Sequence, residues 1–112
     1  MTTPALSLSE TTVDGLSVVR VEGVLDATTR EQFAEYLASA GPELVLDLAG
    51  VTFMDSRALG LIVHHWQTSL ADQRRFALIG VDYARSKVMW ITGLADRLPL
   101  YDTLDDAIAA LG

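Results

Sequence analysis

The stretch from residue 43 to residue 70 most constrains the fold, because a strand pattern and a helix pattern meet in it without a linker. Residues 43–48 (ELVLDL) form a short apolar run, which is typical of a covered strand in the middle of a sheet. Farther along, apolar residues follow the spacing of one helix face: Leu59, Ile62, Val63, Trp66 and Leu70. A strand that leads into such a helix predicts an α/β fold, with the helix packed on the sheet.

The rest of the chain repeats this alternation of strand and helix patterns. Residues 6–9 and 16–21 flank the turn dipeptide Asp14-Gly15 and predict a hairpin that closes at 23–26. Thr28 and Glu31 have capping-box spacing before a helix that Gly41-Pro42 stops. The later elements are a strand at 76–79, a helix at 88–91 that Gly93 ends, a strand at 98–101, and a helix after Thr103. This order predicts one domain, residues 1–112, with a mixed sheet of four to five strands and about four helices packed against it.

The composition narrows the classes of function. The formal net charge of −7 argues against non-specific binding to nucleic acid or to an anionic membrane surface. The chain has no cysteine, which excludes disulfides, thiolate zinc sites and cysteine nucleophiles. Residues 1–12 lack a signal-peptide pattern, and no apolar run is long enough to span a membrane. We therefore expect a cytoplasmic domain without membrane insertion.

Three polar residues, Asp55, Ser56 and Arg57, stand between the central strand and its helix. Sites in sheets of this kind form where strands give way to helices, and Asp26 and Asp82 also follow predicted strands. Because Asp and Ser are favoured N-cap residues, physical reasoning alone favours a helix cap here. The alternative is that Ser56 carries a phosphate at times, since helix N-termini suit phosphate and the group adds about −1.5 to −2 charges.

Catalytic and metal-binding interpretations fit the sequence less well. His64 and His65 lie eight and nine residues beyond Ser56 on one helix, roughly 12 Å or more away, too far to serve as its base. Adjacent histidines on a helix diverge by about 100° and do not share a metal ion, and the chain has no glycine-rich phosphate loop. Asp26 and Asp55 leave open an acid/base pair or a divalent-cation site, although strand-end aspartates are commonly helix caps. We expect neither a cofactor nor enzymatic activity.

A sequence signature runs through this polar corner. Its central block is Val45-Leu46-Asp47-Leu48, then Gly50-Val51-Thr52-Phe53-Met54-Asp55-Ser56, then Leu59-Gly60. Two flanking segments accompany it: Gly23-Val24-Leu25-Asp26-x-x-Thr29, and Ile91-Thr92-Gly93-Leu94 with Leu98-Pro99. Together they resemble the signature of STAS domains, in particular that of the bacterial anti-sigma factor antagonists. The resemblance spans almost the whole chain, and the central block is its most specific part.

The resemblance implies partner switching. In this family the unmodified antagonist binds an anti-sigma factor that is also a serine kinase of the GHKL ATPase type, and so frees a sigma factor. Phosphorylation of the serine after the aspartate releases the antagonist, and a PP2C-type phosphatase resets it. By position that serine is Ser56. Met89 is expected at the surface because its helix has apolar residues on more than one side. Around Ser56 we therefore expect a partner-binding surface made of seven residues: Asp26, Thr28, Thr29, Asp55, Arg57, Ala58 and Met89.

Arg57 and Ala58 depart from the family pattern, which often has Ser or Thr and then Gly after the phosphoacceptor; Val24 also replaces a common Glu. Arg57 would either partly neutralise a phosphoserine or pair with a carboxylate of a partner, whereas Ala58 adds a methyl group to the helix. Two other functions stay open. One is a STAS module that is not phosphorylated, such as the small cytosolic subunit of a lipid-transport ABC system. The other is a small enzyme or nucleotide-binding protein. We favour the phosphorylated antagonist.

Overall fold

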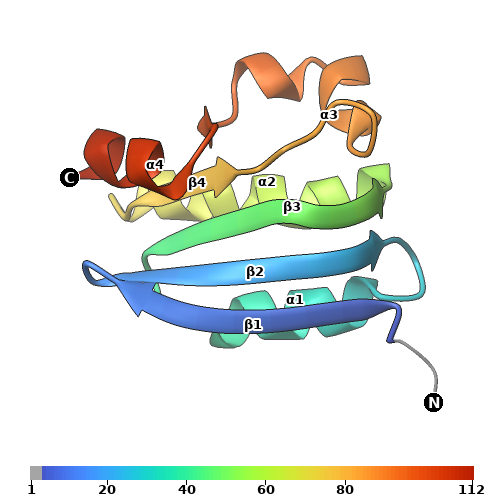
Figure 1. Ribbon diagram of the computed structural model, residues 1–112, viewed down its shortest axis with the longest axis horizontal. Coiled ribbons are helices and arrows are strands. Elements are labelled where there is room, and N and C mark those ends of the chain that lie inside the picture. The colour runs from blue at the N-terminus through green and yellow to red at the C-terminus, as the bar shows by residue number, and fades with distance from the viewer. Residues whose placement is uncertain (1–3) are drawn as a thin grey trace.

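Five strands form one mixed sheet in the computed structural model, which describes residues 4–112 (Figure 1). The strands are β1 (Leu6–Val13), β2 (Leu16–Leu25), β3 (Leu44–Met54), β4 (Phe76–Ile79) and β5 (Leu100–Tyr101). Their order in space is that of the sequence; β1 is antiparallel to β2, and every later neighbour is parallel. The predicted mixed sheet with a central third strand is confirmed.

The β1–β2 hairpin follows from its two turn residues. Asp14 (φ 51°) and Gly15 (φ 79°) both have positive φ, as a two-residue hairpin turn with the twist of the strands requires. All eight residues of β1 then pair with β2 without a register shift. The opening hairpin is therefore built as the Asp-Gly dipeptide predicts.

Helices cover both faces of the sheet (Figure 1). They are α1 (Arg30–Ser39), α2 (Ser56–Ala71), the short α3 (Lys87–Ile91), followed by a 3₁₀ turn (Leu94–Asp96), and α4 (Leu104–Leu111). Side chains of α1, α2 and α3 join the larger core cluster, whereas Ala107 of α4 packs in a second cluster with apolar side chains of β2, β3 and β4. The sheet thus lies between two unequal layers, with α1 and α2 on one face and α4 on the other.

The apolar face of α2 anchors the helix to the sheet. Leu59 and Ile62 are buried, and Val63 and Trp66 pack partly buried against the same core. Leu70, in the last turn, is 60% exposed, so the predicted apolar stripe is covered only up to Trp66. Within residues 4–112, no helix has both the length and the apolar character needed to cross a membrane.

Candidate functional site

A single residue joins the central strand to its helix. Met54 ends β3 and Ser56 begins α2, and the carboxylate of Asp55 between them accepts a hydrogen bond from the backbone N–H of Ala58 at 2.9 Å. The backbone N–H of Asp55 donates to the carbonyl of Leu25 at 2.9 Å, which ties the corner to the end of β2. Asp55 is thus the N-cap of α2, and the predicted cap at this corner is confirmed.

Ser56 is the first residue of α2, and its side chain is exposed. Because the Asp55 carboxylate caps α2, the Ser56 hydroxyl is not the capping group of the helix. The sheet fixes the position of that hydroxyl through Asp55, since Leu25 and Met54 are paired at the ends of β2 and β3. The corner therefore presents an accessible hydroxyl on a rigid joint.

The β2–α1 turn lies beside this joint and is held by its own side chains. The hydroxyl and the backbone N–H of Thr28 both donate to Oδ1 of Asp26, the latter at 2.9 Å. The Thr28 hydroxyl, followed by its N–H, holds the pKa of the Asp26 carboxyl below its usual range. Thr28 is exposed and Asp26 is half-buried, so both predicted site residues lie at the surface next to the α2 corner.

Thr29 has a structural role in the same turn. Its side chain is buried, and its hydroxyl donates to the carbonyl of Val24 at 2.8 Å and accepts from the N–H of Asp26 at 3.1 Å. Thr29 is also the N-cap of α1, but its side chain makes no capping hydrogen bond. The predicted capping box from Thr28 is therefore wrong, because the threonine hydroxyls brace the turn instead. The buried Thr29 side chain is likewise not a surface contact.

Asp26 and Asp55 follow paired strands, as predicted, but each carboxylate accepts hydrogen bonds from its own turn or helix. No group of three His, Asp or Glu side chains in the described part of the chain is arranged to hold a metal ion. The geometry thus favours the structural interpretation of this pair over a dyad.

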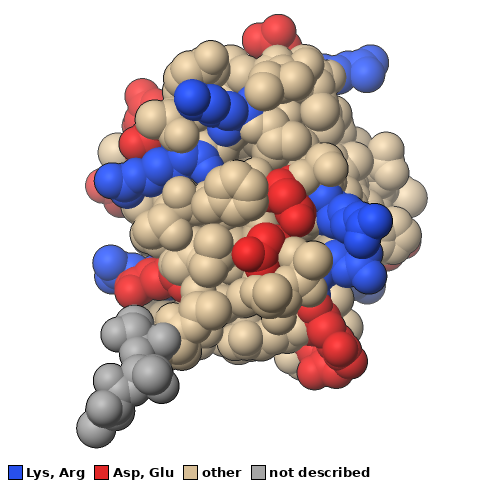
Figure 2. All heavy atoms as spheres, turned by 90° about the vertical axis from the view of Figure 1, so that its right-hand side faces the viewer, with Lys and Arg blue, Asp and Glu red and all other residues tan. Residues whose placement is uncertain are grey.

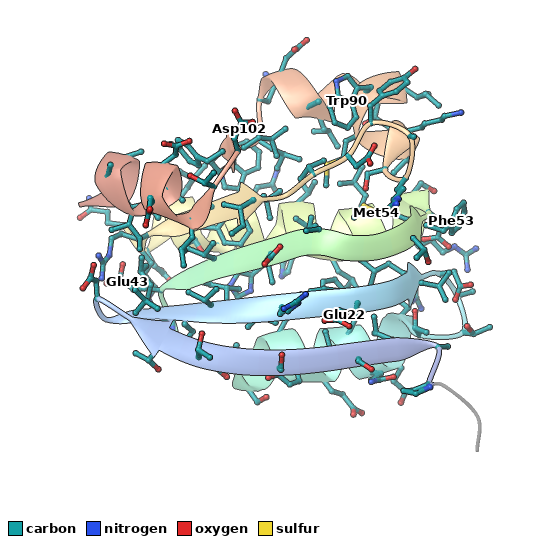
Figure 3. The ribbon with its side chains drawn as sticks, in the orientation of Figure 1. Glu22, Glu43, Phe53, Met54, Trp90 and Asp102 are labelled. Carbon is teal, nitrogen blue, oxygen red and sulfur yellow. The ribbon has the colours of Figure 1, made fainter. Side chains whose placement is uncertain are left out.

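A groove of about 480 Å³ opens next to Ser56, between the start of α2 on one side and α3 with the segment that precedes it on the other. Its lining combines apolar, acidic and basic side chains: Phe53, Met54, Asp55, Ser56, Ala84, Arg85, Lys87, Val88 and Ile91. Phe53 is 51% exposed and Ile91 is 80% exposed. Figure 3 shows Phe53 pointing outward at the end of β3, whereas its neighbour Met54 lies inward. Exposed apolar side chains beside charged ones are typical of a surface that binds a protein partner.

Comparison with known proteins agrees with this architecture. The family model described as STAS domain matches residues 8–107. The chain belongs to the STAS domain family. It is 30% identical to the anti-sigma-B factor antagonist of Staphylococcus aureus (strain NCTC 8325), over 81% of this chain and 88% of that protein. It is 25% identical to the anti-sigma-F factor antagonist RsfA of Mycobacterium tuberculosis, over 97% of this chain and 92% of that protein. The crystal structure of an anti-sigma factor antagonist from Mycobacterium paratuberculosis superposes with a TM-score of 0.83 at 30% identity, covering 99% of this chain and 98% of that one.

Two residues predicted to touch a partner are buried in this STAS domain. Ala58 is 1% exposed and Met89 is 0% exposed, and both side chains belong to the larger core cluster. The prediction of Met89 as a contact is wrong because α3 turns it inward, and about 100° per residue then leaves Trp90 and Ile91 more exposed. Ala58 acts through its N–H, which the Asp55 carboxylate accepts. Arg57 is exposed, as expected.

Of the residues that line the groove, only Asp55 and Ser56 were predicted from the sequence as site residues. The other seven were not: Phe53, Met54, Ala84, Arg85, Lys87, Val88 and Ile91. Phe53 could have been found, because alternation along a strand turns it away from the face that buries Met54. The view onto the strand ends shows acidic side chains near the middle of a largely uncharged area, with basic side chains at its margins (Figure 2). The STAS corner is thus surrounded by more cations than the net charge suggests.

Proposed function

We propose that this STAS domain is an anti-sigma factor antagonist that is controlled by phosphorylation of Ser56. Its similarity to anti-sigma factor antagonists supports the general role. One structural observation supports Ser56 as the site of phosphorylation. The cap of α2 and the exposed hydroxyl are on different residues, Asp55 and Ser56, so the hydroxyl can be modified without removing the cap. In its unmodified form the protein binds an anti-sigma factor that is also a GHKL-type serine kinase, and thereby frees a sigma factor.

In the proposed reaction, Oγ of Ser56 attacks the γ-phosphorus of ATP held by the kinase. The bond from that phosphorus to the ADP oxygen breaks, and the hydroxyl proton passes to a base that the kinase supplies. This chain contributes the position of the Ser56 hydroxyl. The hydroxyl projects from a strand–helix joint that is held by hydrogen bonds, which favours its alignment with the ATP bound to the kinase. The protein is a phosphoacceptor in this scheme and catalyses no step itself.

Phosphorylation would change the charge of the corner more than its shape. A phosphate adds about −1.5 to −2 charges at pH 7, next to the Asp55 carboxylate and the neighbouring Asp26. A partner surface that fits a neutral hydroxyl would then meet repulsion and lose its hydrogen bond. Removal of the phosphate by a PP2C-type phosphatase would restore binding.

The first test is affinity capture from a lysate of the native host, with ADP present and four baits. The baits are the wild type, Ser56→Ala, Ser56→Glu and Ser7→Glu, the last of which adds the same charge at an exposed serine of β1. We expect the wild type and Ser7→Glu to retain a GHKL-type ATPase and Ser56→Glu to lose it. If Ser56→Glu retains the same partner, the switch assignment is wrong, and a constitutive STAS binding subunit becomes the better description.

The second test follows the phosphate itself. The captured kinase, given ATP, should phosphorylate the wild type at Ser56, as located by peptide mass spectrometry, and leave Ser56→Ala unmodified. Phosphate at another residue, or none with an active kinase, would contradict the proposal.

A further inference from the structure

The groove beside Ser56 is also lined by two basic side chains. Arg85 precedes α3 and Lys87 is its first residue, and both line the same groove as Ser56 at the start of α2. Most of the other lining is apolar. The one acidic side chain in the lining is Asp55, whose carboxylate is held as the cap of α2.

Among the described residues, Arg85 and Lys87 have little ionic interaction with other side chains. Arg85 lies 3.9 Å from Asp82, and both side chains are more than half exposed. An exposed ion pair of this kind contributes little, and Asp82 also accepts the N–H of Ala84 at 2.8 Å. Among residues 4–112, Lys87 makes no ion pair. In a chain with 15 acidic and 8 basic residues, two cations that line one groove together with a serine are a local exception.

We propose that Arg85 and Lys87 form a phosphate-binding subsite that holds a phosphoryl group on Ser56 within the same chain. This inference rests on the proposed phosphorylation and adds what the phosphate does once it is present. Both side chains are long and flexible, and each can reach into the groove with its stem on the apolar lining. A phosphate offers three acceptor oxygens, enough for charge-assisted hydrogen bonds from both cations.

The subsite gives phosphorylation a second effect on a partner. Phosphate bound across the groove fills the space next to Phe53 and Ile91, the two large apolar side chains of its lining that are exposed. A partner therefore loses access to these side chains and to the cations at the same time. Release of the partner then depends on the phosphate blocking the groove as well as on charge repulsion.

Arg57 is the competing cation, because it follows Ser56 directly and is exposed. It is not part of the groove lining, and successive residues of a helix diverge by about 100°. A phosphate held by Arg57 would therefore leave the groove open. The two arrangements make different predictions for single and double variants.

The test uses the full chain with phosphoserine incorporated at position 56 during translation, so that it does not depend on any kinase. ³¹P NMR titration measures the second pKa of the phosphate, which is ordinarily about 6. Four phosphorylated proteins are compared: the unsubstituted chain, Arg85→Gln/Lys87→Gln, Arg57→Gln, and a control, Arg20→Gln/Arg74→Gln. The control removes two positive charges from positions outside the groove lining. We expect the groove double variant to raise the phosphate pKa by about one unit, and the control to leave it nearly unchanged.

Equal phosphate pKa values in the groove double variant and the control would overturn the proposal. So would a large rise in Arg57→Gln with none in the groove double variant, since the phosphate would then be bound by Arg57. The kinase reaction on the unmodified protein is a separate readout. Its failure would remove the proposed function, whereas an unchanged phosphate pKa would remove only the subsite.

Discussion

Replacing Asp55 separates its role as a helix cap from its charge. The carboxylate accepts the N–H of Ala58, at the third position of α2, at 2.9 Å. Asparagine keeps an oxygen in that place and alanine does not. Because losing such a cap costs about 1 kcal/mol, we expect Asp55→Ala to lower the free energy of unfolding by that amount. Since Asn and Asp cap about equally well, Asp55→Asn should stay within about 0.5 kcal/mol of the wild type.

Urea unfolding at pH 7, followed by far-UV circular dichroism, measures these differences. Asp102→Ala serves as a control at an exposed aspartate outside the helices, with an expected change within about ±0.5 kcal/mol. Amide exchange at Ala58 should accelerate in Asp55→Ala and not in Asp55→Asn. If the asparagine variant is as unstable as the alanine variant, the oxygen is not what Asp55 contributes, and the cap argument fails.

Three further predictions concern Gly23 and Thr29, near the site, and His65, farther along α2. Gly23→Ala should lower the free energy of unfolding, measured with urea, by at least about 3 kcal/mol. The reason is that Gly23 has a φ of +112° and the new Cβ would lie 2.1 Å from the carbonyl oxygen of Ala5. Near-wild-type stability would contradict this prediction. Thr29→Val should lower stability by about 1–3 kcal/mol by removing a buried, hydrogen-bonded hydroxyl, and Thr29→Ser should recover most of it in thermal unfolding. Burial, and then the neighbouring His64, lower the pKa of His65 below its ordinary 6.5. The His65 contribution to stability should therefore be fully present above about pH 6.5 and be lost as the pH drops toward the folded-state pKa. His65→Gln should remove this fall in unfolding measured between pH 7.5 and 5, whereas His64→Gln, which removes only the smaller cause of the pKa shift, should flatten it less.

Elements with local signals could be predicted closely. Residues 76–79 are four apolar residues between an arginine and a glycine, and β4 has these bounds. The end of β3 could not be predicted, because Ala49-Gly50 resembles the close of a strand. In the structure β3 continues to Met54, since Gly50 and Val51 pair with Glu22 and Gly23, with a register shift before and after them where β3 has an extra residue. Such pairing depends on a partner strand far away in the sequence, which no local pattern contains.

The site was predictable to the extent that its residues are adjacent in sequence. Asp55 and Ser56 lie together wherever the chain folds, so only their division into cap and exposed hydroxyl needed the structure. The α3 side of the groove could not be placed, because the helix has five residues and four of them are apolar. Such a segment has no clear polar face, and packing alone decides that Met89 is buried and Ile91 exposed.

The two departures from the family pattern bear on different properties once the geometry is known. The Ala58 methyl lies in the core, so its difference from glycine concerns packing and helix stability rather than recognition. Arg57 is exposed and follows Ser56 directly, and Arg85 and Lys87 line the groove that Ser56 also lines. Exposed charges farther apart than about 8 Å are largely screened at physiological salt. A partner that binds at this corner, as proposed, would therefore respond to three cations and two aspartates more than to the net charge of −7, and the proposed phosphorylation would change that local balance.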